Sequence, residues 1–439
     1  MAKKLHVISL GCTKNLVDTE VMLGRLQKYK MTDNPQEADV LIVNTCGFID
    51  AAKEESINTI LDLNEARKKN SILVMAGCLS ERYKEEMKKE IPEIDIFTGV
   101  GDYAQIDKLI EEKNSHFASD VFLIDQEERV ITGSNYHAYI KLSEGCNQTC
   151  SFCAIPSFKG KLHSRTLESV EKEIGILVKK GYFDFTFISQ DSSSYLRDQN
   201  IDDGLVKLIK KVETISGVKS ARILYLYPST TTTSLIEAIA NSSVFHNYFD
   251  IPLQHISDSM LKRMKRGFGK EKTLELVNKI FSIKDAFVRT SFIVGHPGES
   301  DTEYEELKEH IINTPYDMIN IFEYSKEEGT LSFDMEDAVP KNIIRKRIKE
   351  LKKIIDKKLH EKLNTYIGKP MDLVLNGVSS EHELLYSAKN IAWAPEIDPE
   401  ILINDTDLND LEAGKLYHAH ITAATPTQLI AAIIQSENT

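Results

Sequence analysis

Three apolar runs near the start of the chain each end in a cysteine, and this repeat limits the fold more than any other feature. The runs cover residues 5–10, 40–43 and 72–76, and they precede Cys12, Cys46 and Cys78. Consecutive cysteines are separated by about 33 residues, close to the ~30 residues of a strand-helix-strand unit. Helices are expected between and after the runs, at residues 15–29, 51–69 and 81–89. Because the carboxyl ends of parallel strands share one edge of a sheet, we expect the three cysteines to converge; burial as small core residues is the alternative.

Length and composition indicate a globular chain of several domains. The chain has 439 residues, of which 28% are charged and 41% hydrophobic, and it contains only six cysteines. These values exclude a disulfide-stapled miniprotein and a disordered chain, and no apolar run reaches the ~18 residues of a membrane helix. The apolar stretch before Cys12 is short for a secretion signal and is interrupted by His6 and Ser9, so we interpret it as a buried strand. We therefore expect a cytoplasmic protein with reduced cysteines.

A second alternation of strands and helices begins near residue 136, after a turn-rich or polar stretch at residues 102–116. Strands are expected at residues 138–142, 183–188, 221–226, 249–253, 288–294 and 318–322. Helices are expected at residues 167–180, 205–215, 234–241, 257–265, 272–282 and 301–312. This alternation predicts a partial parallel β/α barrel, short of eight units. A long basic helix is expected to follow at residues 341–366.

From Gly368 onward the pattern changes to short strands separated by polar turns. The strands are expected at residues 371–375, 383–386, 401–403, 416–421 and 429–434. Five short strands in about 70 residues predict a small antiparallel barrel of the oligonucleotide/oligosaccharide-binding kind. The segment has three lysines, no arginine and eleven acidic residues, which gives −8 of the total charge of −13. Such a surface repels a phosphate backbone and attracts a basic protein, unless the acidic turns are merely a solvated face.

The strongest local motif is the C-x3-C-x2-C spacing of Cys146, Cys150 and Cys153, directly after the first strand of the expected barrel. This spacing lets three thiolates from one loop face an iron-sulfur cube, and no fourth cysteine follows to complete the coordination. The loop lies at the carboxyl-end face, where β/α barrels place their active sites. A zinc site with His163 as the fourth ligand is the alternative.

With this motif, the barrel segment resembles the radical S-adenosylmethionine enzymes. The resemblance implies that Cys146, Cys150 and Cys153 hold a 4Fe-4S cluster whose open iron binds S-adenosylmethionine. The residues that it further implies beside this cofactor are Phe152, Ser189, Gln190 and Gly295.

The three parts together resemble the methylthiotransferases over essentially the whole chain. This resemblance implies a flavodoxin-like α/β domain at residues 1–115, a radical S-adenosylmethionine barrel with a terminal helix at 132–366, and an acidic TRAM domain at 368–439. It implies a second 4Fe-4S cluster on Cys12, Cys46 and Cys78, so that the six cysteines form two sets of three. In such enzymes one S-adenosylmethionine methylates a sulfur. A second is cleaved reductively to a radical that removes hydrogen from the substrate, and an electron donor supplies the electron for this cleavage. No catalytic side chain beyond the cysteines is assigned.

Residues 9–18, 250–255 and 394–398 resemble the protein-modifying type of methylthiotransferase. This type converts an aspartate of small-subunit ribosomal protein twelve, a basic substrate, to its β-methylthio form. Nucleic acid is then expected only in the context of the ribosome, and no membrane is expected as a partner. One alternative is the transfer-RNA adenosine type, which usually has Gln-Met-Asn where this chain has Thr13, Lys14 and Asn15. The other is a non-catalytic, metal-stabilised adaptor that binds a basic partner.

Three arginines are candidates for orienting the substrate carboxylate, and each is equally suited to a structural ion pair. They are Arg165, Arg222 and Arg289.

Overall fold

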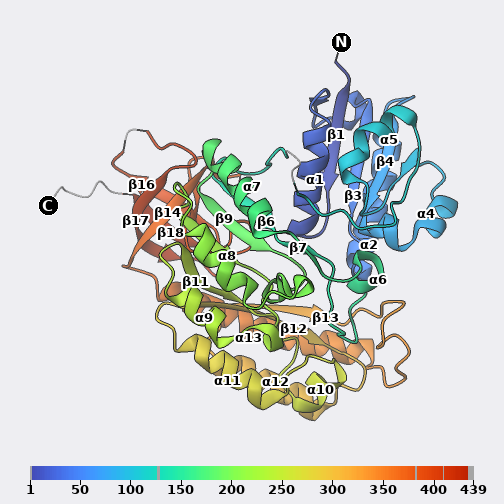
Figure 1. Ribbon diagram of the computed structural model, residues 1–439. Helices are drawn as coiled ribbons and strands as arrows, with labels where there is room; N and C mark the ends of the chain where they lie inside the picture. The colour runs from blue at the N-terminus through green and yellow to red at the C-terminus, as the bar shows by residue number, and fades with distance from the viewer. Residues whose placement is uncertain (1, 126–128, 381–382, 409, 434–439) are drawn as a thin grey trace.

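The computed structural model describes residues 2–125, 129–380, 383–408 and 410–433. An N-terminal α/β body, a central open barrel and a small C-terminal β-barrel follow one another along the chain (Figure 1). Among the described residues, we find no helix whose length and hydropathy would let it span a bilayer.

The N-terminal sheet has five parallel strands in the order β2-β1-β3-β4-β5. The strands are β1 (Lys4–Ser9), β2 (Lys30–Met31), β3 (Val40–Thr45), β4 (Ile72–Gly77) and β5 (Ile96–Phe97). The helices around them are α1 (Thr13–Arg25), α2 (Asp50–Ala66), α3 (Cys78–Arg82), α4 (Lys84–Glu90) and α5 (Ile106–Glu112). Strands β1, β3 and β4 confirm the three apolar runs, whereas the two-residue strands β2 and β5 are too short to leave a periodic signal.

Residues 102–116, expected to be turn-rich or polar, contain helix α5, which the sequence did not predict. Ile106, Leu109 and Ile110 recur at helical spacing and are buried in the N-terminal core. Their three apolar side chains are enough to fix a short amphipathic helix, although polar residues dominate the stretch.

The central sheet has six parallel strands in the order β13-β12-β11-β10-β9-β6. The strands are β6 (His137–Lys141), β9 (Asp184–Ile188), β10 (Ser220–Ile223), β11 (Phe245–Asp250), β12 (Phe287–Val294) and β13 (Met318–Glu323). The helices are α7 (Leu167–Lys179), α8 (Gly204–Val212), α9 (Thr233–Ala240), α10 (Asp258–Arg263), α11 (Lys270–Phe281) and α12 (Asp301–Asn313). The edge strands β6 and β13, both of which the structure describes in full, do not pair, so the predicted partial barrel is confirmed.

Strand β11 begins and ends earlier than the expected residues 249–253. The apolar Ile251 and Leu253 lie beyond its end, in a loop, and both are fully buried. At residues 251–253 the apolar pattern therefore indicates buried side chains and not a paired strand.

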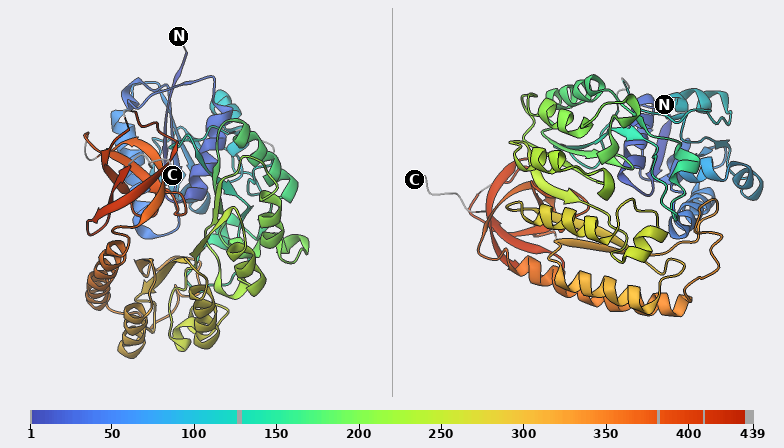
Figure 2. Two further views of the ribbon diagram at one scale, coloured as in Figure 1. Left: turned by 90° about the vertical axis from the view of Figure 1, so that its left-hand side faces the viewer. Right: turned by 60° about the horizontal axis from the view of Figure 1, so that its bottom comes forward.

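Helix α13 (Lys341–Asn364) runs along the central barrel toward the C-terminal barrel (Figure 2). Ile344 and Leu351 are buried against the central core, while most of its lysines lie on the outer side. This arrangement makes α13 a solvated connecting helix.

The C-terminal barrel is closed, in the order β14-β15-β16-β18-β17. Its strands are β14 (Pro370–Val378), β15 (Tyr386–Asn390), β16 (Ile401–Thr406), β17 (Leu416–Ala424) and β18 (Leu429–Ile433). The pair β16 and β18 is parallel, which corrects the expectation of a wholly antiparallel barrel. The strand expected at residues 383–386 begins only at Tyr386, and the expected last residue of β18, Ile434, lies outside the described residues.

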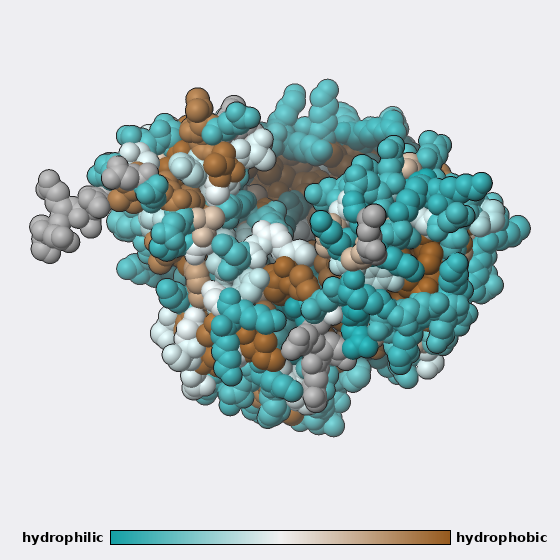
Figure 3. Space-filling model, turned by 90° about the horizontal axis from the view of Figure 1, so that it is seen from above, coloured by the Kyte–Doolittle hydropathy of each residue, from teal (hydrophilic) through white to brown (hydrophobic). Residues whose placement is uncertain are grey.

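The central and C-terminal barrels share one apolar core. Tyr139, Leu224 and Phe287 from the inner face of the central sheet pack in the same cluster as C-terminal residues. Trp393 joins the two, with its ring centre 5.3 Å from that of Phe287. The surface is hollowed between the N-terminal body and the C-terminal barrel (Figure 3).

Candidate functional site

The first cysteine set lies at the carboxyl ends of three neighbouring strands. Cys12 follows β1, Cys46 follows β3 and Cys78 follows β4, and these strands are consecutive in the sheet. Cys46 and Cys78 are buried, whereas Cys12 is exposed. The predicted convergence of the three cysteines at one sheet edge is thus what the strand order produces.

Two glycines let these strand ends approach closely. Gly11 has φ +85°, and a Cβ there would lie 2.6 Å from the Cβ of Cys46. Gly77 has φ +94°, and a Cβ there would lie 2.3 Å from Oδ1 of Asn44. Both positions exclude a side chain, so the backbone can bring the cysteines together only with glycine.

Asn15 ties the three strand ends to one another. Its Nδ2 donates to the carbonyl oxygens of Leu10 and Thr45, each at 3.1 Å, and its Oδ1 accepts from Sγ of Cys78 at 3.5 Å. Asn15 was not among the predicted site residues, although it lies only three residues after Cys12. Helix α1 places it at the edge because the helix begins immediately after that cysteine.

Two thiols of this set, those of Cys46 and Cys78, have raised pKa values. Burial raises the pKa of Cys46 to about 11 and that of Cys78 to about 12, and the neighbouring Cys12 adds to both. The mutual effect places the three sulfurs within electrostatic reach of one another. Such thiols stay protonated at neutral pH and lose their protons when a metal binds.

The second cysteine set lies on the loop between β7 (Ser143–Glu144) and α6 (Ile155–Lys159). Strand β7 pairs with β8 (His163–Ser164), and the backbone N–H of Cys146 donates to the carbonyl of Gly160 at 3.1 Å, so both ends of the loop are fixed. Burial raises the pKa of Cys146 and of Cys153 to about 12, and Cys150 adds to each. The three sulfurs therefore form a second group at the carboxyl-end face of the central sheet.

Arg266 is a site residue that the sequence did not reveal. Its Nη1 donates to Sγ of Cys150 at 3.1 Å, and its guanidinium lies 4.2 Å from the ring centre of Tyr227. The hydroxyl of Tyr227 is itself 3.7 Å from the same sulfur. A single arginine after α10 belongs to no motif, so only the fold brings it to the cysteine.

Of the four residues predicted beside the cofactor, Phe152 lies within the loop of the second set, and Gln190 contacts Glu144, two residues before Cys146. Phe152 packs on Met260, Met264 and Ile293, with its ring 6.4 Å from that of His296. Gln190 donates through Nε2 to Glu144, while its Oε1 is buried without a hydrogen-bond partner among the described residues.

The other two predicted residues make internal contacts. Ser189 is buried, and its hydroxyl donates to Oγ of Ser192 at 3.2 Å. Gly295 donates its N–H to Glu299 at 2.6 Å, and a Cβ there would lie 2.5 Å from Ile344 of α13. The packing of α13 by itself accounts for a glycine at this position.

A buried group of charges lies between the two cysteine sets. Lys141 pairs with Asp18 and, at 2.8 Å, with Glu144; Lys159 lies 3.5 Å from Asp18 and 3.3 Å from Glu144. Burial favours the neutral acid, but the two lysines outweigh it and lower the pKa of Glu144 to about 2. Because Asp18 belongs to α1 and the other three to the central body, these ion pairs fix the orientation of the two bodies.

The three candidate arginines all make internal ion pairs. Arg165 pairs with Glu173, Arg222 pairs with Asp184, and Nη1 of Arg289 is 3.7 Å from Asp250. Each of the three arginines thus forms a structural ion pair, the alternative that the sequence left open.

His163 is exposed on β8. Within the part of the chain that the structure describes, no three His, Cys, Asp or Glu side chains surround a position for a single metal ion. The zinc alternative therefore gains no support.

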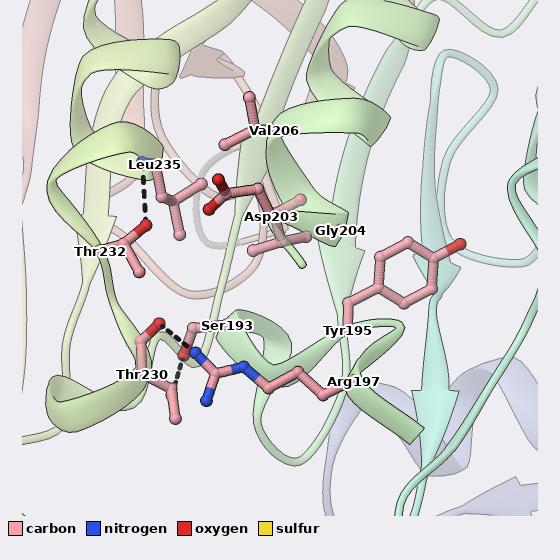
Figure 4. A pocket seen from close by; sticks show the side chains of 10 residues that line it. Ser193, Tyr195, Arg197, Asp203, Gly204, Val206, Thr230, Thr232 and Leu235 are labelled. Carbon is pink, nitrogen blue, oxygen red and sulfur yellow. Dashed lines mark hydrogen bonds between the residues drawn. The ribbon is translucent and has the colours of Figure 1, made fainter. Parts of the chain in front are cut away.

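A shallow polar pocket lies elsewhere on the central body, between the start of α8 and the segment before α9 (Figure 4). Ser193, Arg197, Asp203, Thr230 and Thr232 line it. The described residues around it include neither a cysteine nor any of the predicted site residues.

Three families match successive parts of the chain. Residues 4–99 match the family described as Uncharacterized protein family UPF0004. Residues 140–311 match the Radical SAM superfamily, and residues 367–434 match the TRAM domain.

Curated relatives are similar over nearly the whole chain. The Ribosomal protein uS12 methylthiotransferase RimO of a Nitratiruptor species is 60% identical over 99% of this chain and 100% of its own length. The protein of the same name from Sulfurimonas denitrificans is 61% identical over 96% of both chains. That of Campylobacter jejuni subsp. jejuni serotype O:6 is 53% identical over 98% of both.

Among solved structures, the radical S-adenosylmethionine methyltransferase TsrM from Kitasatospora setae, with tryptophan substrate and the analogue aza-SAM bound, gives a TM-score of 0.54. The match covers 73% of each chain at 12% identity. A second structure of TsrM, with cobalamin and a [4Fe-4S] cluster bound, gives 0.51 over 74% of this chain and 72% of its own. At this identity the likeness concerns the fold alone.

Proposed function

We infer the reaction of this chain from one premise: it belongs to the RimO family of ribosomal protein uS12 methylthiotransferases. The chain is a radical S-adenosylmethionine enzyme that methylthiolates uS12, with S-adenosylmethionine and 4Fe-4S clusters as cofactors. The names of the relatives favour this activity over the transfer-RNA alternative and over a non-catalytic adaptor.

The observation that carries the proposed site is the division of the six cysteines into two groups of three. We propose Cys12, Cys46 and Cys78 as ligands of one cluster, and Cys146, Cys150 and Cys153 as ligands of the other. Three soft thiolates on a tight loop or at one sheet edge are the donor set that iron-sulfur clusters take. Three cysteines per set leave one corner of each cube for a ligand that is not protein.

The surrounding residues fit such groups. Arg266 offers a positive charge and an N–H donor to Cys150, which stabilises a thiolate. The buried Oε1 of Gln190 lacks a described partner, as expected where a ligand is to be bound.

Once bound, the clusters and S-adenosylmethionine supply the radical chemistry and the methylthio group, which no amino-acid side chain can provide. The protein binds and orients. The ion pairs of Asp18, Lys141, Glu144 and Lys159 hold the two cysteine sets in a fixed relation, and the burial of Cys46 and Cys78 keeps water from these two thiols.

Four residues remain our proposal for the S-adenosylmethionine site. Phe152 and Gln190 have side chains beside the second cysteine set. Ser189 directly follows β9 and Gly295 directly follows β12, both at the carboxyl-end face of the central sheet. Ser189 contacts Ser192, and Gly295 packs against Ile344. We propose contact through Phe152 and Gln190, with Ser189 and Gly295 shaping the site.

We place the first contact of uS12 on the acidic C-terminal barrel. The exposed acidic residues there are Asp372, Glu383, Glu396, Asp405, Asp407, Asp410 and Glu412. Asp398 is buried and does not belong to this face, and Glu381 and Glu437 lie outside the described residues. A face with this charge attracts a basic ribosomal protein and accelerates its association.

The proposed domain boundaries are residues 1–115, 132–366 and 368–439. Helix α5 ends at Glu112 and β6 begins at His137, while α13 ends at Asn364 and β14 begins at Pro370, so each boundary falls between elements. We further propose an external electron donor as a partner, and the cytoplasm as the location because the substrate is a ribosomal protein.

Mass spectrometry of uS12 tests the function. We expect uS12 from a deletion strain to lack one methylthio group, and a plasmid with the wild-type gene to restore it. A Cys146→Ala gene should not restore it, whereas Lys108→Met, a change at an exposed lysine, should. Unchanged uS12 in the deletion strain, together with loss of a methylthio-adenosine from transfer RNA, would contradict the proposal.

A further inference from the structure

Eight lysine and arginine side chains are buried in the described part of the chain. Six of them pair with carboxylates: Arg129, Lys141, Lys159, Arg165, Arg222 and Arg347. Lys14 and Arg266 have no described carboxylate within ion-pair distance. A buried charge without an opposite charge is costly, so each of these two requires an explanation.

Arg266 is explained by the second cysteine set. Its guanidinium donates to Sγ of Cys150 at 3.1 Å and to the carbonyl of Pro252 at 2.6 Å. When Cys150 ligates a cluster, its thiolate provides the opposite charge.

Tyr225 is the described partner of the Lys14 ammonium, and no described carboxylate forms an ion pair with it. The residue is 9% exposed in the first turn of α1, and Nζ lies 3.5 Å from the ring centre of Tyr225. Burial opposes the charged form of Lys14, whereas Tyr225, Cys12 and Glu144, in that order, favour it and raise its pKa. Glu144, the one carboxylate among these three, is already paired with Lys141 and Lys159. An ammonium has three N–H donors, and an aromatic face satisfies its charge only in part.

The position of Lys14 links the two cysteine sets. It lies two residues after Cys12, and Tyr225 is two residues before Tyr227, on which Arg266 stacks. Tyr225 and Tyr227 thus belong to one short segment after β10. Tyr225 contacts Lys14, near the first cysteine set, and Tyr227 contacts Arg266, near the second. Neither cation has a described carboxylate partner. Lys14 therefore lies beside the first cysteine set and, through Tyr225 and Glu144, close to residues that surround the second.

We propose that Lys14 binds the side-chain carboxylate of the substrate aspartate and so selects aspartate over its amide. This inference rests on the proposed function, because it needs an aspartate substrate at the cysteine sets. The three arginines suggested by the sequence are occupied by internal carboxylates, which leaves Lys14, within the described chain, as the buried cation available to a substrate.

Binding measurements on the anaerobically reconstituted holoenzyme, without reductant, test the proposal. Labelled uS12 and uS12 with asparagine in place of the modified aspartate are titrated against wild type, Lys14→Met, Lys14→Arg and the exposed control Lys108→Met. S-adenosylmethionine binding and the visible absorbance of the clusters are recorded for each variant. Wild type and the control should bind the aspartate form about tenfold more tightly than the asparagine form, the effect of one close charge pair.

Lys14→Met should bind both forms of uS12 equally within about twofold, with unchanged absorbance and S-adenosylmethionine affinity, and Lys14→Arg should recover part of the preference. A tenfold preference that persists in Lys14→Met overturns the proposal. A loss of cluster absorbance in Lys14→Met also overturns it, because Lys14 would then support the cysteines. A loss of S-adenosylmethionine affinity alone overturns it too, because Lys14 would then bind the carboxylate of S-adenosylmethionine. If wild type neither prefers the aspartate form nor methylthiolates uS12, the proposed function fails as well.

Discussion

At the scale of single residues, the first cysteine set depends on neighbours without reactive groups. Gly11 leaves room for Cys46, and Asn15 bonds to the strand ends that precede Cys12 and Cys46 as well as to Cys78. A thiol has little value as a ligand unless its backbone is held in position, and these residues hold it.

Gly11→Ala should therefore disable the first set. Alanine strains a backbone at φ +85° and places its Cβ 2.6 Å from Cys46, so we expect a loss of about 1–3 kcal/mol of stability. Bound iron should fall from about eight to about four atoms per chain, since the second set is untouched. Iron analysis and thermal unfolding provide the measurement.

Gly175→Ala is the matched control. Gly175 lies within α7 with nothing within 4 Å of an added Cβ, so alanine should leave the iron content unchanged and stabilise the helix by about 0.5–1 kcal/mol. If both variants keep all their iron, the account of Gly11 is wrong.

The sequence predicted those residues whose spacing is itself the signal. The repeat of Cys12, Cys46 and Cys78 follows from the length of a strand-helix-strand unit, and the other three cysteines share one loop. Arg266 reaches Cys150 only through the packing of the segment after α10, and Lys14 reaches Tyr225 only through the packing of α1 on the central body. No periodicity in the sequence records either contact. The same limit explains why Arg165 and Arg222 stayed ambiguous until their carboxylate partners were seen.

At the scale of elements, periodic stretches predicted strands and helices well. The short strands β2 and β5, the polar helix α5 and the parallel pair β16 and β18 were missed. Pairing between distant strands depends on closure of the barrel, for which a local pattern has no signal.

The segment between β15 and β16 joins the C-terminal barrel to the central one through a buried carboxyl group. Burial raises the pKa of Asp398 to about 6, and Arg289 offsets this only in part. Its Oδ2 accepts from the backbone N–H of Ala394 at 2.8 Å, while Oδ1 has no described partner.

This pKa gives a pH dependence of defined sign. Between the unfolded value near 3.9 and about 6, the folded state holds more protons, so stability falls as the pH rises through this window. Asp398→Asn has no carboxyl group to ionise here, so its free energy of unfolding should fall by about 2–3 kcal/mol less than that of wild type over this pH window. The melting temperature of the variant relative to wild type should therefore increase from pH 4 to pH 7.

Asp405→Asn, at an exposed carboxylate, is the control and should keep the slope of the wild type. A slope in Asp398→Asn equal to that of wild type would show that this carboxyl group is ionised in the folded protein.

At the scale of the whole molecule, charge is distributed by role. The C-terminal barrel exposes acidic side chains, α13 exposes lysines, and the buried charges between the cysteine sets are paired. The acidic barrel is thus suited to attract uS12, while the paired interior fixes the reaction site.

Reversing two charges on the acidic face should slow association with uS12. Asp405→Lys combined with Asp410→Lys should lower the association rate constant several-fold at low salt, with little change in the dissociation rate constant. The difference from wild type should shrink as salt screens the charges. Stopped-flow binding measures this, and an equal rate for both proteins at low salt would remove the barrel from the docking path.

Iron stoichiometry shows whether the six cysteines form two independent three-thiolate sites. After anaerobic reconstitution, wild type should bind about eight iron atoms per chain. Cys146→Ala and Cys12→Ala should each bind about four, and the double variant should bind almost none. A wild-type chain that binds zinc instead of iron, or a Cys146→Ala variant that keeps all its iron, would contradict the account.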